Sequence, residues 1–200
     1  MTQILNVRPD VLSETFSGGS GSDSSLIADK LVEALSVVES ATARNAAAPR
    51  AGESIEDQLF DSRSACKITT AHIAMHFSEQ WRRGLFRQLD TLIDFENWDE
   101  EDLPPNPESF RTLLRMVLLL KPRRRPGLGA TATGNFTAMW SIDDSHLTIE
   151  CKQGDQLRWF VSLAGETAGG RTTLARLSEV LAPYHPEIWF EKAVAQADPR

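Results

Sequence analysis

The sequence predicts an α+β fold, in which N-terminal helices are followed by a small three- to four-stranded antiparallel β-meander and a C-terminal covering helix. Two observations predict this fold. Apolar residues recur at helical spacing up to about residue 120, and from Gly127 onward short segments rich in β-branched and aromatic residues alternate with turn sequences. The chain of 200 residues has room for one such domain and an N-terminal extension.

Residues 1–54 are predicted to form a flexible arm that carries one amphipathic helix. The arm contains only serine and glycine over residues 17–22, which is typical of a flexible linker. A helix is expected over about 24–43, because apolar residues recur there at steps of three or four. Such a helix needs a surface on which to bury its apolar stripe, on its own domain, on a second copy or on a partner. The stripe consists of Ile27, Leu31, Leu35 and Val38.

Residues 55–200 are predicted to form the compact domain. Its first helix is expected from about residue 70 or 78 to 94, with Gly84 as a weak point. Residues 65–77 are compatible with a strand or a helix, because they combine β-branched residues with helical spacing. The spacing by four is carried by Ile73, Phe77, Trp81, Leu85 and Leu89.

The next helix is expected over about 108–120, and both of its ends carry clear signals. Asn106 provides a capping side chain and Pro107 occupies the first helical position. Lys121 and Pro122 end the helix. Because few polar residues lie between these ends, we expect the helix to be buried over most of its circumference.

The second half of the domain is expected to be a β-meander. Two polar segments between the expected strands, 143–145 and 153–155, are typical of hairpin turns. A helix over 172–182 then covers the sheet, and Trp189 and Phe190 pack the tail onto the core. The expected strands are 136–142, 146–152, 157–163 and a fourth at 128–132.

Composition excludes several functional classes. The net charge of −7 argues against a protein that coats nucleic acid by bulk electrostatics, although residues 106–200 carry a net +2 and leave a local phosphate contact open. The sequence shows no apolar run of membrane-spanning length and no secretory signal. Cys66 and Cys151 have neither zinc-site nor redox spacing, which favours a reducing compartment. We therefore expect a cytoplasmic protein without membrane contact or cofactor.

A phosphate-binding motif is approximated by residues 165–172. The segment has the spacing G-x4-G-K-[ST], with Arg171 in the place of lysine. The strand before it belongs to an antiparallel meander, however, whereas phosphate-binding loops of this kind need a parallel sheet. We therefore expect a flexible loop between a strand and a helix.

Two histidines suggest a metal site as an alternative. On a helix, His72, His76 and Glu79 share one face, and two imidazoles with a carboxylate suit zinc. No further protein ligand is evident, and neither Cys66 nor Cys151 has the surroundings of a nucleophile. The expectation is therefore that the protein is not an enzyme.

The acidic bend, residues 94–102, interleaves six carboxylates with two aromatic residues, a composition suited to docking a basic protein. The aromatic anchors are expected to be Phe95 and Trp98. The charge complement is expected to be Asp99, Glu100, Glu101 and Asp102.

The arginine loop, residues 121–126, lies beyond the 108–120 helix, on the opposite side of that helix from the acidic bend in the sequence. Its three successive guanidinium groups suit phosphate or carboxylate. These are Arg123, Arg124 and Arg125.

These features lead to three functional hypotheses. The first is a bacterial, non-enzymatic regulatory protein-binding module of the antitoxin, immunity-protein or accessory-subunit type, docking a partner with a basic surface through the acidic bend and the arm helix. The second is a nucleic-acid-contacting accessory protein that uses residues 123–125, with an exposed Trp159 or Trp140 for base stacking. The third is a metal-dependent hydrolase at His72 and His76.

Overall fold

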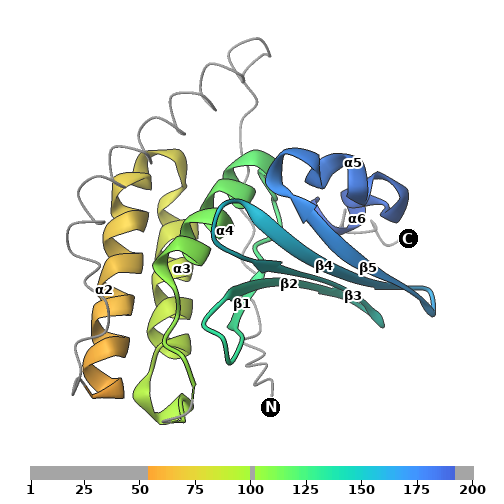
Figure 1. Cartoon of the computed structure of the whole chain (residues 1–200). Helices are drawn as coiled ribbons and strands as arrows, with labels where there is room; N and C mark the ends of the chain where they lie inside the picture. The colour runs from red at the N-terminus through yellow and green to blue at the C-terminus, as the bar shows by residue number, and fades with distance from the viewer. Residues whose placement is uncertain (1–53, 100–101, 192–200) are drawn as a thin grey trace, which may run out of the picture.

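The computed structural model describes residues 54–99 and 102–191. The predicted arm helix (about 24–43), with Ile27, Leu31, Leu35 and Val38, lies outside the described residues, and so do Glu100 and Glu101. Within the described ranges the fold is α+β: three helices, then a five-stranded antiparallel meander, then short C-terminal helices (Figure 1). The predicted fold class is confirmed.

The helical part begins with α2 (Ile55–His72), whose N-terminus is capped by Ser54. A 3-10 helix, η1 (Ala74–His76), separates it from α3 (Glu79–Leu92), which Ser78 caps. Of the two predicted starts for this helix, the one at 78 is confirmed and the one at 70 is wrong. The segment 65–77 is therefore the end of one helix and a link to the next.

The sequence pattern did not reveal α2, because several of its inward positions are polar. Ser62, Thr69 and Thr70 are buried there beside Leu59 and Cys66. The Thr69 and Thr70 hydroxyls donate to the carbonyls four residues earlier, at 2.8 and 2.9 Å. Buried polar groups are tolerated when they are hydrogen-bonded, so a weakly amphipathic helix packs as an interior one.

Helix α4 (Pro107–Leu120) has the boundaries that its capping signals predict. Asn106 Oδ1 accepts a hydrogen bond from the Glu108 amide at 2.8 Å, and Lys121 ends the helix in the left-handed conformation. The helix is buried on most sides, as expected. No helix in the described ranges has both the length and the apolar character that crossing a membrane requires. The 3-10 helix η2 (Phe95–Asn97) lies between α3 and α4.

The sheet has the order β1-β2-β3-β4-β5, with every neighbouring pair antiparallel. One more strand is present than was predicted, because 166–173 is the edge strand β5. Its alternation is hidden by the residues Ala-Gly-Gly at its centre. The strands are β1 (Gly127–Ala130), β2 (Phe136–Ile142), β3 (Ser145–Cys151), β4 (Gln156–Leu163) and β5 (Glu166–Thr173).

The predicted covering helix over 172–182 is replaced by a series of short helices, since Thr172 and Thr173 still belong to the sheet. Trp189 and Phe190 at the end of the series are buried, which confirms that the tail packs on the core. The elements of the series are η3 (Leu174–Arg176), α5 (Leu177–Leu181), η4 (Ala182–Tyr184) and α6 (Pro186–Phe190).

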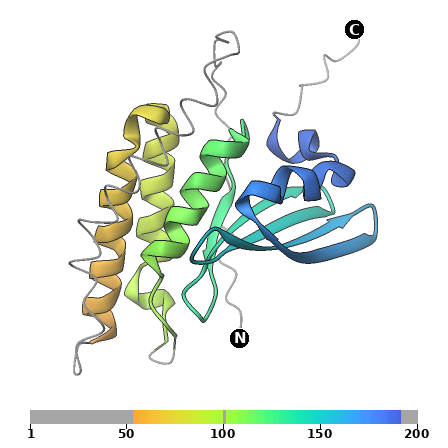
Figure 2. The same ribbon diagram turned by 45° about the horizontal axis from the view of Figure 1, so that its top comes forward.

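One face of the sheet is covered by helices. Aromatic pairs join that face to three different elements: α4 through Phe110–Phe136, α6 through Trp140–Phe190, and η4 through Trp159–Tyr184, with ring centroids 4.9 to 5.2 Å apart. In Figure 2 the short C-terminal helices lie above the sheet and α4 lies beside it, between the sheet and α3. Among the described elements, none covers the opposite face, which we call the open face (Figures 1 and 2).

Candidate functional site

The acidic bend is folded back onto the end of α3. Trp98 Nε1 donates to the Leu92 carbonyl at 2.7 Å, and Asn97 Nδ2 donates to the Thr91 carbonyl at 3.0 Å. The Trp98 ring is partly buried against the core. It therefore holds the bend in place instead of facing outward.

Among the predicted residues that the structure describes, Phe95, Asp99 and Asp102 contribute to the surface of the bend. Phe95 is 50% exposed and Leu103, just beyond the bend, is 58% exposed. Asp99 is exposed and Asp102 is half-buried. The Asp102 amide donates to the Asp99 carbonyl at 3.0 Å, which closes a turn and brings these two acids together. An exposed aromatic ring thus lies in the same short bend as exposed carboxylates.

The C-terminal end of the bend is attached to the sheet. The Leu103 amide donates to the Ala132 carbonyl at 3.1 Å, and the Asn106 amide donates to the Gly134 carbonyl at 2.8 Å. Both acceptors lie in the turn between β1 and β2. The described parts of the bend are therefore hydrogen-bonded to the rest of the fold at both ends, and η2 is their one regular element.

The arginine loop does not present three equivalent side chains. Arg123 is exposed, and its amide donates to the Phe190 carbonyl at 2.7 Å. Arg124 is half-buried, and its carbonyl accepts a hydrogen bond from Trp140 Nε1 at 3.0 Å. The loop backbone is thus tied to α6 and β2.

Arg125 packs against α3. Its guanidinium lies over Gly84, where an added Cβ would be 1.4 Å from Arg125 Nη1. The absence of a side chain at Gly84, predicted to be a weak point of the helix, makes room for this arginine. Of the three arginines, the structure therefore leaves Arg123 with an exposed side chain.

The tryptophans that were expected to stack on bases are buried. Trp140 is 2% exposed and Trp159 is 8% exposed, and both point toward the covered face of the sheet. That part of the nucleic-acid hypothesis is wrong, because strand alternation places both rings in the core.

The histidines lie at a break between helices. His72 is the last residue of α2, and His76 belongs to η1, so the spacing rule of a single helix does not apply to them. Both side chains are exposed. Within residues 54–99 and 102–191, no group of three His, Cys, Asp or Glu side chains is placed to hold a metal ion.

Cys66 and Cys151 are free thiols in the core. Burial raises the pKa of both thiols well above the ordinary value, and for Cys151 the nearby Glu150 and Asp155 carboxylates act in the same direction. At neutral pH both are protonated, and they pack as small apolar side chains.

The segment that resembles a phosphate-binding motif is a strand. Gly165 lies in the turn between β4 and β5 with φ +84°, and 166–172 belong to β5. The prediction of a flexible loop is therefore wrong. The segment lies flat along β4 and has no helix N-terminus directed at its glycines.

This strand creates a feature that the sequence analysis missed. On the open face, Arg158 of β4 lies directly opposite Arg171 of β5, and Phe160 lies directly opposite Gly169. Both arginines are exposed, and Phe160 is 49% exposed. Together with Trp159 and Gly170 they line a shallow hollow of about 360 Å³.

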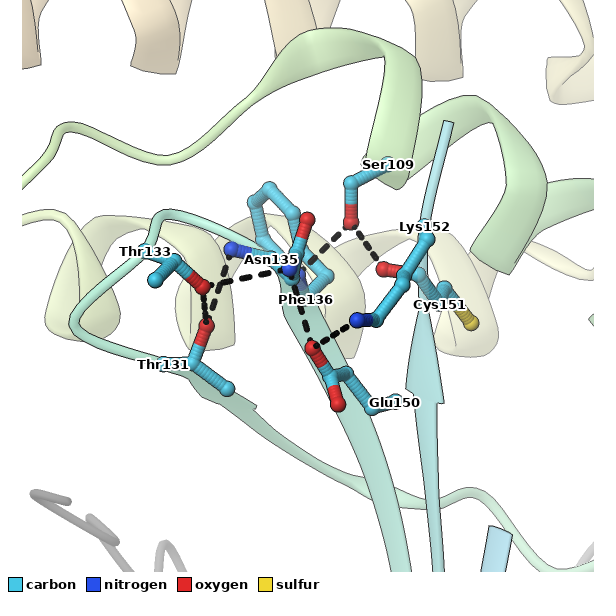
Figure 3. A network of polar contacts seen from close by, with 8 residues as sticks. All are labelled: Ser109, Thr131, Thr133, Asn135, Phe136, Glu150, Cys151 and Lys152. Atoms are coloured by element: carbon cyan, nitrogen blue, oxygen red, sulfur yellow. Dashed lines mark hydrogen bonds and ion pairs between the residues drawn. The ribbon is translucent and has the colours of Figure 1, made fainter. Parts of the chain in front are cut away.

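The acidic residue that is paired with Arg158 on the neighbouring strand has other partners. Glu150 of β3 lies opposite Arg158, but its carboxylate accepts a hydrogen bond from Asn135 Nδ2 at 2.9 Å and lies 3.6 Å from Lys152 Nζ. Figure 3 shows this network around Glu150. Neither arginine side chain forms an ion pair or hydrogen bond with any part of the chain that the structure describes.

One signal for this hollow was present in the sequence. The inward positions of β4 are Leu157, Trp159 and Val161, so Arg158 and Phe160 must point to the other face. The outward position of the aromatic Phe160 indicates this surface. The pairing of Arg171 with Arg158 does not follow from the sequence, because residues 165–172 are predicted there to form a loop and not a strand.

The chain matches no known protein-family model, and comparison with curated proteins and with solved structures gave no match either.

Proposed function

We propose that this protein is a non-enzymatic regulatory module, of the kind found among antitoxins, immunity proteins and accessory subunits, which docks a basic partner protein through the acidic bend. The observation that carries the proposal is the half-exposed Phe95 ring on a bend that is hydrogen-bonded to α3 at one end and to the β1–β2 turn at the other. A fixed aromatic ring bordered by carboxylates is a form of preorganised contact surface.

The contributions of the two kinds of residue differ. Burying the exposed half of the Phe95 ring supplies affinity, on the order of 0.8–1.5 kcal/mol, which is half of the value for a fully exposed large apolar side chain. Asp99 and Asp102, with Glu100 and Glu101, supply attraction to a basic surface and a faster encounter with it. Trp98 acts as a positioning residue, since its ring lies against the protein's own core.

The arm provides a second contact in this proposal. Its apolar stripe needs a surface to cover it. We assign the partner as that surface, so that the arm and the bend bind together and raise the affinity through linkage. The stripe consists of Ile27, Leu31, Leu35 and Val38.

The test is recovery of a partner from the native host with tagged full-length protein, followed by affinity measurement with the purified partner. F95S is expected to weaken binding about tenfold or more, and D99K/D102K to weaken it and to abolish its salt dependence. The matched control is D144K/E166K, which makes the same charge change in the β2–β3 turn and at the first residue of β5. Equal recovery by all variants would remove the bend from the proposal.

A further inference from the structure

We propose that the open face of the sheet binds single-stranded nucleic acid, with phosphate on Arg158 and Arg171 and a base stacked on Phe160. This site is separate from the acidic bend: in Figure 1, β4 and β5 lie on the far side of the sheet from α2 and α3, and η2 follows the end of α3. The proposal therefore stands or falls independently of the docking function.

The first argument is the arginine pair. Like charges directly opposite one another on neighbouring strands destabilise a sheet. Glu150, which lies opposite Arg158 on β3, accepts a hydrogen bond from Asn135 and lies near Lys152, and it forms no ion pair with either arginine. An anion between the two guanidinium groups would relieve it, and phosphate matches the planar fork of arginine.

The second argument is the shape beside the arginines. Phe160 is half exposed, and its cross-strand neighbour Gly169 has no side chain that could cover the ring, which lies against this glycine, with Cδ2 3.5 Å from the position of an added Cβ. On its other side, Phe160 is paired with the half-buried Thr148 of β3. The resulting hollow of about 360 Å³ falls within the volume range of sites for small molecules and cofactors.

Together, the arginine pair and the Phe160 ring indicate a ligand that carries both a phosphate group and a planar ring. A peptide of aspartate and glutamate alone would satisfy the arginines but would give Phe160 nothing to stack upon. In a double helix the faces of the bases are already covered, whereas single strands expose them to aromatic side chains on a sheet. The chain's net charge of −7 repels a polyanion at long range, so this contact is local and strongly weakened by salt.

The test measures fluorescence anisotropy of fluorescein-labelled dT12 and U12 with the full-length protein from about 50 to 200 mM NaCl. R158Q and R171Q are each expected to weaken binding at least fivefold and to reduce the slope of log K against log salt by about 0.7, the value for one lost phosphate contact on a single strand. F160L is expected to weaken binding about tenfold without changing that slope.

The matched control is R83Q, which removes the same charge from an exposed position on α3 and is expected to leave the affinity within twofold. Circular dichroism melts establish that each variant is folded. Should R171Q melt early, R171K, which keeps the charge without the fork, takes its place and is expected to weaken binding at least threefold.

Four results would overturn the proposal. The first is absence of binding to both oligonucleotides at 50 mM salt. The second is full affinity in F160L. The third is competition by poly-glutamate as effective as that by unlabelled oligonucleotide, which would indicate an anion site only. The fourth is a loss caused by R123Q and not by R171Q, which would place the contact on the arginine loop.

Discussion

Gly134 lies so close to Pro104 that a Cβ on the glycine would be 2.4 Å from the Pro104 carbonyl oxygen. Gly134 also has a φ of +76°, which side chains rarely adopt. Its carbonyl accepts a hydrogen bond from the Asn106 amide at 2.8 Å. The end of the acidic bend is therefore positioned by a glycine of the β1–β2 turn.

Replacing this glycine is expected to destabilise the protein. G134A adds backbone strain and forces two main-chain segments apart, with an expected cost of about 2–4 kcal/mol in the free energy of unfolding. The matched control is G154A, since Gly154 has a φ of +69° but nothing within 4 Å of an added Cβ. Urea titration of both variants separates the steric contact with Pro104, which G134A alone introduces, from the backbone strain that both variants share. Equal losses of unfolding free energy in G134A and G154A would show that the contact with Pro104 does not add to the destabilisation.

A second prediction concerns the join between α4 and the sheet (Figure 3). The Ser109 hydroxyl donates to the Cys151 carbonyl at 2.6 Å and accepts from the Phe136 amide at 2.7 Å, and all three residues are buried. S109A leaves a buried N–H without an acceptor, which costs about 1–3 kcal/mol.

The control for S109A is T91A, because the Thr91 hydroxyl bond to the Arg87 carbonyl is exposed to water. Chemical denaturation is expected to show a loss for T91A within about 0.5 kcal/mol. A similarly small loss for S109A would mean that water or a local shift replaces the serine oxygen.

The parts of the fold that the sequence predicts well are those with strong local signals. Helix α4 has a cap, a proline and a stop, and each is used as expected. Strands β2, β3 and β4 alternate so regularly that their bounds are predicted within one residue. Helix α2 and strand β5 were missed for opposite reasons. Helix α2 lacks an apolar stripe because some of its buried positions are polar, and strand β5 lacks a clear alternation because its centre contains glycines.

The candidate sites, too, are only partly predictable from local sequence signals. The acidic bend is evident from composition, but only tertiary structure reveals that Trp98 faces the core while Phe95 remains outside. The pairing of Arg158 with Arg171 depends on the register of two strands, one of which was not predicted. Residues 13 positions apart in sequence become neighbours only through that register.

The buried thiols predict a specific pH dependence. Burial raises the pKa of Cys66 and Cys151 in the folded state. Their contribution to stability is therefore complete below the unfolded thiol pKa of about 8.5 and is lost as the pH rises above it, by about 1.4 kcal/mol per thiol per pH unit. Denaturation at pH 8, 9 and 10 measures this loss, and C151A is expected to reduce the slope above pH 9.

The same burial predicts slow alkylation. Iodoacetamide at pH 8 is expected to modify neither thiol in the folded protein and both in denaturant, because only a thiolate that is accessible reacts. Mass spectrometry after timed quenching checks this. Rapid modification in native buffer would contradict the placement of Cys66 and Cys151 in the core.

The last prediction separates positioning from contact within the acidic bend. W98F keeps an aromatic ring against the core but removes the hydrogen bond from Trp98 Nε1 to the Leu92 carbonyl. We expect it to lower the free energy of unfolding by about 0.5–1.5 kcal/mol and to weaken partner binding as the bend loosens.

F95S is expected to weaken binding strongly and to leave stability within about 0.5 kcal/mol, because the Phe95 ring is half exposed. Thermal melts and partner titrations on both variants give the comparison. If F95S proved the more destabilising of the two, the ring would have a structural role and the assignment of Phe95 as the contact residue would fail.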